Sequence, residues 1–199
     1  MGVRNRNNSA DTFFDLSELC SLVRISSSYS GEFMQNNSLT VSMKLGMRRL
    51  ASGVCVLSTA LPDNQRFAMT VSSVTSVSDS PASLLVCINQ LVSQQGHLAT
   101  IGSQFAVNVL SAHHQDVSNI CAGREPNRNR FEVGQWEDDD TGVPVLMDAQ
   151  AVFLCQTDQV MTYGTHKIIV GAIHKVILPE VAVDPLLYAD GSYGAFLKQ

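Results

Sequence analysis

The chain has 199 residues, of which 45% are hydrophobic and 16% charged, and 13 Lys and Arg stand against 18 Asp and Glu for a formal net charge of −5. A chain of this size can bury the core of one globular domain. The acidic balance, without a stripe of Lys and Arg, excludes nucleic acids and anionic membrane surfaces as expected partners. No apolar run approaches the roughly 20 residues that a membrane-spanning helix needs.

The cysteine pattern favours a reducing compartment. No cysteine pair forms C-x-x-C, and each cysteine lies in an apolar or nearly apolar stretch, which is typical of buried free thiols. Asp15, Glu18 and Arg24 interrupt the apolar residues near the N-terminus, so that segment does not resemble a signal peptide. We therefore expect a cytoplasmic protein with five free thiols, at Cys20, Cys55, Cys87, Cys121 and Cys155.

Residues 1–40 predict a flexible N-terminal appendage. They are rich in Asn and Ser and cannot bury enough apolar surface to offset the entropy of ordering. Within them, residues 11–24 favour a short amphipathic helix. An over-extended start, with Met34 or Met43 as the true beginning, is the alternative. The globular domain is expected over residues 41–199.

From residue 42 onward, the sequence predicts short helices and strands separated by turns. Residues 42–53 predict a short helix that ends at Gly53. Further short helices are expected over residues 97–103 and over residues 112–122, the latter capped by Ser111 and closed by Gly123. Residues 123–144 predict a long polar loop. Strands are expected at residues 54–61, 66–78, 82–89, 104–110, 151–162 and 166–178, with a strand-like piece and turn at 184–196.

About six or seven strands against two or three short helices predict a mostly β fold. Because the strands follow one another through short turns, we expect a closed or nearly closed antiparallel barrel with a few peripheral helices. The chain lacks the glycine-rich motifs of Rossmann and Walker nucleotide sites, and it lacks H-E-x-x-H and G-x-S-x-G. No His, Cys or Asp spacing supports a metal site, and none is expected.

One stretch, MTVSSVTSVSDSPASLLVCIN at residues 69–89, is unusually rich in small hydroxyls. It holds eight Ser and Thr side chains between apolar residues and a single charge, Asp79. The simpler interpretation is a surface strand with its hydroxyls in water. The other is a cradle for a ligand that is polar and partly buried.

Several stretches, in order, resemble the flavin reductase-like family with its FMN-binding split-barrel fold. They are LASGVCVLST, the hydroxyl-rich stretch above, FAVNVLSAHHQDVSNICAG, RFEVGQW and YGTHKIIVGAIHKVIL, within residues 43–193. Among them, DSPASLLVCIN and GTHKIIVGAI look closest to reductase components of two-component aromatic hydroxylases, such as that of 4-hydroxyphenylacetate 3-monooxygenase. The resemblance implies a split β-barrel that uses NADH or NADPH to reduce free FMN or FAD, and a separate oxygenase component that receives the reduced flavin. It also implies a homodimer with the flavin near the subunit interface. From their apolar residues, we expect residues 105–110 or 166–173 to supply the contact.

The resemblance also implies a binding site. Hydroxyls of the cradle would line the flavin's ribityl chain, phosphate and ring edge, since hydroxyl and backbone N–H groups suit a phosphate where no P-loop exists. Arg130 would lie near the flavin phosphate or the nucleotide, and Ser93 would help to hold the phosphate. His166, in the G-T-H motif, is implied near the nicotinamide or the flavin pyrimidine, as the candidate catalytic residue. The implied cofactor-binding set is Met69, Thr70, Val71, Ser72, Ser73, Cys87, Ile88, Asn89, Ser93, Arg130, His166 and Tyr193.

Two departures from the family pattern bear on the ligands. Gln90 stands where an Arg is common, which leaves FMN against FAD open. Asp190, between Tyr188 and Tyr193, disfavours a second phosphate and weakly favours NADH over NADPH. His113 and His114 are expected at the surface.

Two rival functions follow from the same fold. A non-catalytic sensor or carrier would bind flavin or haem tightly and accept no hydride from NADH. An oxidase of the pyridoxamine-phosphate type would need a basic substrate pocket, for which the chain offers too few Arg and Lys residues.

Overall fold

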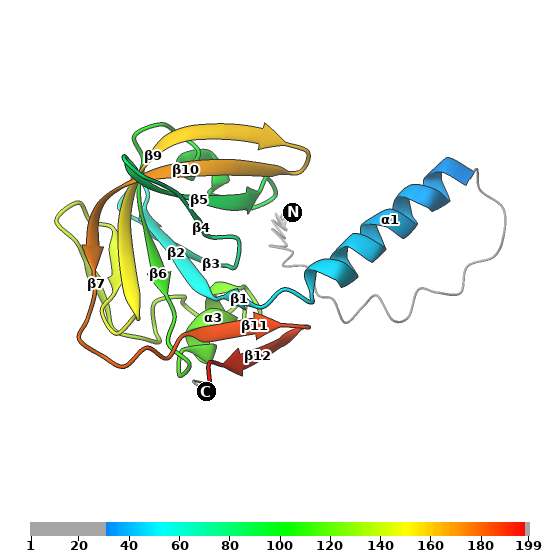
Figure 1. Ribbon diagram of the computed structural model, residues 1–199. Coiled ribbons are helices and arrows are strands. Elements are labelled where there is room, and N and C mark those ends of the chain that lie inside the picture. The colour runs from blue at the N-terminus through cyan, green and yellow to red at the C-terminus, as the bar shows by residue number, and fades with distance from the viewer. Residues whose placement is uncertain (1–30, 198–199) are drawn as a thin grey trace, which may run out of the picture.

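The computed structural model describes residues 31–197 and shows a β-rich body from which one helix projects (Figure 1). The helices in this part of the chain are α1 (Gly31–Met47), α2 (Gln95–Leu98) and α3 (Gln115–Cys121). The strands are β1 (Ser52–Gly53), β2 (Cys55–Ala60), β3 (Arg66–Val71), β4 (Thr75–Asp79), β5 (Ala82–Asn89), β6 (Gln104–Val109), β7 (Trp136–Asp138), β8 (Pro144–Leu146), β9 (Ala151–Tyr163), β10 (His166–Ile177), β11 (Leu186–Ala189) and β12 (Ser192–Ala195). The predicted fold class, mostly β with few helices, is confirmed. The predicted strand count is too low, in part because β7 lies in the expected loop and β8 begins at its last residue.

The main sheet has seven strands in the order β3-β2-β6-β9-β10-β5-β4, each antiparallel to its neighbours. Its two edge strands, β3 and β4, follow each other in the chain and are joined only by residues 72–74. Three linking residues span at most about 14 Å between Val71 and Thr75. The sheet must therefore curl until its edges meet at residues 72–74, a junction that we call the seam.

The centre of the sheet is buried on both faces. β2 and β6 are neighbours, and nearly all of their residues are inaccessible to solvent. This burial explains their near-continuous apolar sequences, which lack the alternation of a half-exposed strand. Residues 105–110 therefore cannot supply the exposed dimer contact that the sequence suggested.

A buried amide ties the β7–β8 hairpin to this centre. Asn108 Nδ2 donates to Val56 O at 3.0 Å and to Ser58 Oγ at 2.9 Å, and its Oδ1 accepts from the Leu146 N–H at 2.9 Å. Since Asn108 is fully buried, each of these bonds satisfies a polar group that would otherwise be costly to bury. One side chain thus joins β2, β6 and β8.

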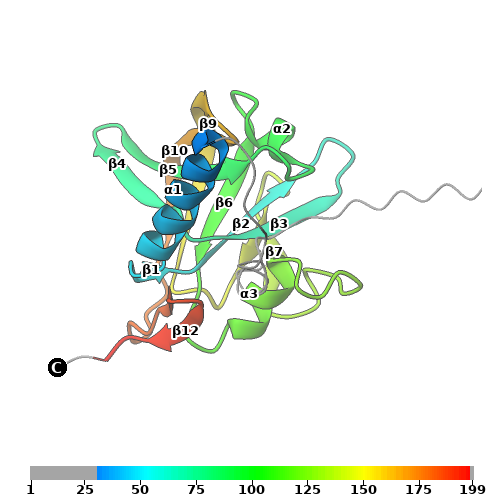
Figure 2. The same cartoon turned by 90° about the vertical axis from the view of Figure 1, so that its right-hand side faces the viewer.

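A second, three-stranded sheet, in the order β1-β11-β12, lies with α3 at one end of the barrel (Figures 1 and 2). Its hairpin turn is tied to the residue after α1: Asp190 N–H donates to Arg48 O at 2.7 Å, and Arg48 Nε lies 3.3 Å from Asp190 Oδ1. Asp190 has a φ of 47°, and Gly191, which follows it, has a φ of 78°. The turn thus has the left-handed backbone that Asp and Gly tolerate best.

The predicted helix ending at Gly53 is wrong at both ends. α1 begins at Gly31 and ends at Met47, and Gly53 lies in β1. α1 stands away from the barrel, with Leu39, Met43 and Met47 exposed (Figure 1). The division predicted at residue 40 falls inside this helix and stays a prediction, while the helix predicted at residues 11–24 lies outside the described residues. Among residues 31–197, no helix has the length and apolar character that crossing a membrane requires.

Ser111 does not cap α3 as predicted. The N-cap residue is His114, without a side-chain capping bond, and Ser111 lies three residues earlier in an isolated bridge to Pro185. The predicted stop is correct, because the helix ends at Cys121 and Gly123 has a φ of 75°.

We expect Gly171→Ala to destabilise the fold. An added Cβ would lie 2.5 Å from Phe105 Cζ and 3.1 Å from Cys155 Cβ, inside the core. Overpacking of this kind costs about 1–3 kcal/mol, and thermal or urea unfolding would measure it. Gly194→Ala is the matched control, since no atom lies within 4 Å of its added Cβ. Equal unfolding midpoints for the two variants would contradict the packing of β10 against β6.

Candidate functional site

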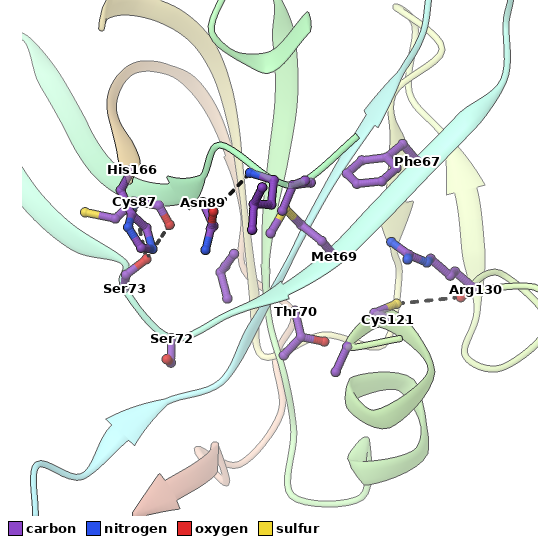
Figure 3. Close-up of a pocket in the computed structure, with 14 residues that line it drawn as sticks. Phe67, Met69, Thr70, Ser72, Ser73, Cys87, Asn89, Cys121, Arg130 and His166 are labelled. Atoms are coloured by element: carbon purple, nitrogen blue, oxygen red, sulfur yellow. Dashed lines mark hydrogen bonds between the residues drawn. The ribbon is translucent and has the colours of Figure 1, made fainter. Parts of the chain in front are cut away.

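A cleft of about 300 Å³ opens beside the seam (Figure 3). This volume lies at the lower end of the range typical of small-molecule sites. Its walls come from β3, residues 72 and 73, the ends of β5 and α3 with the loops after them, and the start of β10. The lining residues are Phe67, Met69, Thr70, Val71, Ser72, Ser73, Cys87, Asn89, Leu91, Val92, Cys121, Ala122, Arg130 and His166.

The alternation of β5 decides which of its side chains reach the cleft. Successive side chains of a strand point to opposite faces. Cys87 and Asn89 line the cleft, whereas Ile88, between them, is fully buried in the core. The sequence suggested Cys87, Ile88 and Asn89 as one continuous floor, but the Ile88 side chain does not line the cleft.

Two of the expected hydroxyls hold the walls together. Thr70 Oγ1 donates to Ser118 O on α3 at 2.7 Å. Ser73 Oγ donates to Cys87 O and accepts from the Cys87 N–H, both at 3.1 Å, which fastens the seam to β5. The Ser72 hydroxyl is exposed and has no hydrogen-bond partner among the described residues. Ser72 is therefore the hydroxyl of this group most available to a ligand.

Among the residues that the structure describes, Arg130 is the one permanently charged side chain that lines the cleft. Its guanidinium lies 5.3 Å from the centroid of the Phe67 ring and donates to Ala68 O. Cys121 Sγ donates to the Arg130 carbonyl at 3.8 Å. These contacts fix a cation at one side of the cleft, where it can bind an anionic group such as a phosphate.

His166 lies on the opposite side of the cleft from Arg130 (Figure 3). It begins β10, is paired with Asn89 of β5, and its Nδ1 is 2.9 Å from Thr165 Oγ1. Asn89 Oδ1 accepts the Leu91 N–H at 3.0 Å, which sets the turn that follows β5. An exposed imidazole at this place can hydrogen-bond a bound ligand.

The structure brings nine of the twelve predicted site residues together. Ile88 lies in the core, Ser93 is exposed outside the lining, and Tyr193 is occupied with α3. Five lining residues were not predicted from the sequence: Phe67, Leu91, Val92, Cys121 and Ala122. Phe67 sits two positions before Met69 and so shares its face of β3, which strand alternation could have indicated. Leu91 and Val92 lie in a loop, and Cys121 and Ala122 lie at the end of α3. Their packing against the cleft could not be predicted from the local sequence pattern.

His113, His114 and Asp148 form a compact group next to α3, with donor atoms within 4.8 Å of one another. His114 is buried, which corrects its predicted surface position, and burial lowers the pKa of its imidazole against the opposing effect of Asp148. Its Nδ1 accepts the Ser111 N–H at 3.1 Å, so the proton of the neutral ring is on Nε2. That Nε2–H faces Asp148 Oδ2 at 3.1 Å and offers no lone pair to a metal ion. The arrangement is a pair between a buried His and a half-buried Asp at the start of α3.

The model of the flavin reductase like domain matches residues 47–196 of this chain. The chain belongs to this family. The resemblance and the fold inferred from the sequence are thereby confirmed. The residues that line the cleft match the chemical groups of a flavin: apolar walls suit the flat ring, hydroxyls suit its polar edges, and one cation suits a phosphate.

Known proteins of similar sequence carry related names. An FMN reductase (NADH) RutF of Ancylobacter novellus is 38% identical over 123 residues, 62% of this chain and 67% of that protein. The reductase component of an FADH2-dependent resorcinol hydroxylase from a Rhizobium strain is 36% identical over 150 residues, 75% of this chain and 83% of that protein.

A solved structure supports the same fold. BorF, the flavin reductase component of a bacterial two-component tryptophan halogenase, superposes with a TM-score of 0.71 at 29% identity. The match covers 80% of this chain and 99% of that one.

We expect a flavin to protect Cys87 from thiol reagents. Burial raises the pKa of the Cys87 thiol moderately, and raises those of Cys55, Cys121 and Cys155 to about 12. In a Cys20→Ser background, Cys87 should therefore react first with a disulfide reagent, faster as the pH rises because the thiolate is the nucleophile. Saturating FMN should slow this reaction about tenfold or more by covering the cleft. Cys87→Ser is the control that removes the fast phase, and a fast phase unaffected by FMN would place the flavin elsewhere.

Proposed function

We propose that this protein is a flavin reductase that oxidises NADH and reduces free FMN in the cleft at the seam. The observation that carries the proposal is the meeting of Ser72, Arg130 and His166, from distant parts of the chain, around one cleft of a family member. The names of the relatives support the same class of reaction. They give no support to a sensor or carrier that lacks hydride transfer.

The chain's own residues would bind and orient rather than react. Arg130 would hold the flavin phosphate, and Ser72 would hydrogen-bond the polar part of the flavin between phosphate and ring. Phe67, Val71 and Val92 would exclude water from the ring. The redox chemistry would be supplied by the flavin when it is bound, so no protein acid or base is obligatory. The protein contributes position and desolvation.

His166 would act on the nicotinamide side. It begins β10 at the hairpin that follows β9, and it lies on the far side of the cleft from Arg130 (Figure 3). A nicotinamide bound at this side would lie over the flavin ring. Its imidazole could hydrogen-bond the carboxamide and so fix the face of the nicotinamide. Both ligands must share this cleft, because the described chain offers no second domain beside the barrel.

For the ligands, we propose FMN over FAD and NADH over NADPH. The relatives named FMN reductase (NADH) support both choices. The argument from Asp190 no longer supports NADH, since this carboxylate faces Arg48 in the hairpin turn and does not line the cleft. A single cation in the lining also suits one phosphate better than two.

We further propose that the protein is a cytoplasmic homodimer that delivers reduced flavin to a separate oxygenase. The free thiols at Cys55, Cys87, Cys121 and Cys155 are consistent with a reducing compartment. Apolar side chains exposed on α1, such as Leu39 and Met43, need a partner surface. The outer face of β10 carries half-buried Ile168 and Val170 beside the cleft, and a second subunit could cover both.

The deciding experiment is NADH oxidation by the purified protein, followed by absorbance at the nicotinamide band. Oxidation that requires added FMN and turns over many equivalents is the expected result, with FAD and NADPH run in parallel to rank the ligands. Tight flavin or haem binding without NADH oxidation would favour the sensor or carrier instead.

Ser72→Tyr should abolish FMN binding. The larger side chain would fill the cleft at the seam, so the Kd for FMN should rise by about 100-fold or more, measured by quenching of flavin fluorescence. Ser93→Tyr is the matched control, because Ser93 is an exposed serine outside the lining, and it should bind FMN like the wild type. Equal affinities for the two variants would remove Ser72 from the site.

His166→Ala should raise the KM for NADH by about fivefold to tenfold, and that for FMN by less, because one hydrogen bond to the nicotinamide is lost. His174→Ala on the same strand is the control. Its Nε2 is 3.1 Å from Gln104 Oε1, away from the cleft. Unchanged KM values for both substrates would contradict the role assigned to His166.

A further inference from the structure

Tyr193 connects the C-terminal hairpin to α3 through its hydroxyl. The hydroxyl oxygen lies 2.9 Å from Ser118 Oγ and 2.9 Å from Asn119 Oδ1, both on α3. A phenol has one hydrogen to donate, and Asn119 Oδ1 can only accept. The phenol therefore donates to Asn119, and the Ser118 hydroxyl can donate back to Tyr193.

The same turn of α3 forms part of the cleft wall. The Ser118 carbonyl accepts the hydroxyl of Thr70, which lines the cleft from β3, at 2.7 Å. Three and four residues further on, Cys121 and Ala122 line the cleft themselves. Figure 3 shows Thr70 beside the end of α3 that carries Cys121. The path from Tyr193 to the cleft thus consists of two hydrogen bonds and one helical turn.

α3 depends on such contacts for its position. It has only seven residues and no side-chain cap at its N-terminus, and helices this short are unstable unless tertiary contacts hold them. The hairpin that holds it is itself anchored, because Asp190 in its turn is bonded to Arg48. Arg124, just beyond α3, adds a bond to Asn119 Oδ1 at 3.0 Å and lies 5.7 Å from the centroid of the Tyr193 ring.

We propose that Tyr193 is a positioning residue for the flavin cleft: its hydroxyl holds α3 against β3 and so sets the distance between the wall of Cys121 and Ala122 and the seam. This proposal rests on the proposed function, since it concerns the affinity of that cleft for flavin. It gives Tyr193 a role different from the direct cofactor contact that the family resemblance implied.

The test is Tyr193→Phe, which removes one oxygen and keeps the ring. The KM and the Kd for FMN should rise about fivefold, as expected when one partly buried hydroxyl and its hydrogen bonds are lost, while kcat at saturating FMN stays unchanged. Tyr188→Phe is the matched control. Tyr188 packs against the Tyr193 ring at 5.3 Å between centroids, and its hydroxyl has no hydrogen-bond partner among the described residues. Its FMN affinity should equal that of the wild type.

A double-mutant cycle shows whether Tyr193 acts through α3. Thr70→Val breaks the bond between β3 and Ser118. If Tyr193 works through this contact, the two substitutions should raise the Kd for FMN together by clearly less than the product of their separate effects. Effects that multiply would show independent actions and overturn the proposal.

Thermal melts separate positioning from general stability. A merely structural Tyr193 would lower the melting temperature and the active fraction, and so kcat, while leaving the Kd of the folded protein at the wild-type value. That result would overturn the proposal although the wild type still reduces flavin. Failure of the wild type itself to bind FMN would instead overturn the proposed function, and this inference with it.

Discussion

The short connection between β3 and β4 is the constraint on which the rest of the structure depends. The two edges of a seven-stranded sheet are joined by residues 72–74 alone. A twisted sheet whose edges are tied this closely has to curl into a barrel, yet the strands on either side of residues 72–74 do not pair with each other. The opening that remains is where the cleft lies, so fold and site have one origin.

This origin explains the concentration of small hydroxyls in the sequence. A seam cannot satisfy its polar groups through a continuous strand ladder, and side chains must replace the missing bonds. Ser73 does so toward the backbone of β5, and Thr70 does so toward α3. Ser72, left over between them, is exposed in the cleft. Part of the cradle is therefore structural: the hydroxyls of Thr70 and Ser73 bond to the backbone instead of facing water, as a surface strand would have required. Ser72 is the hydroxyl that remains for the proposed ligand.

The second support of the cleft comes from the end of the chain. The β11–β12 hairpin closes one end of the barrel and contacts α3, whose last turn forms the wall opposite the seam. The same hairpin is bonded to Arg48, directly after α1. Residues that stand far apart in the sequence thus form one continuous set of contacts around the cleft.

The sequence by itself determined the fold class and most of the strands, because alternating and continuous apolar runs such as residues 82–89 and 104–109 depend on local chemistry. It also indicated the hydroxyl-rich cradle and, through ordered family motifs, nine of the residues that the cleft brings together. Only the tertiary structure decided which neighbours on β5 face the cleft, that Tyr193 bonds to α3, and that Cys121 and Ala122 form part of the cleft wall. Those facts arise from contacts such as Thr70 with Ser118 and Ser118 with Tyr193, 48 and 75 positions apart in the chain. The local sequence pattern does not predict such contacts, since the same residue types would suit a solvent-facing strand or helix equally well.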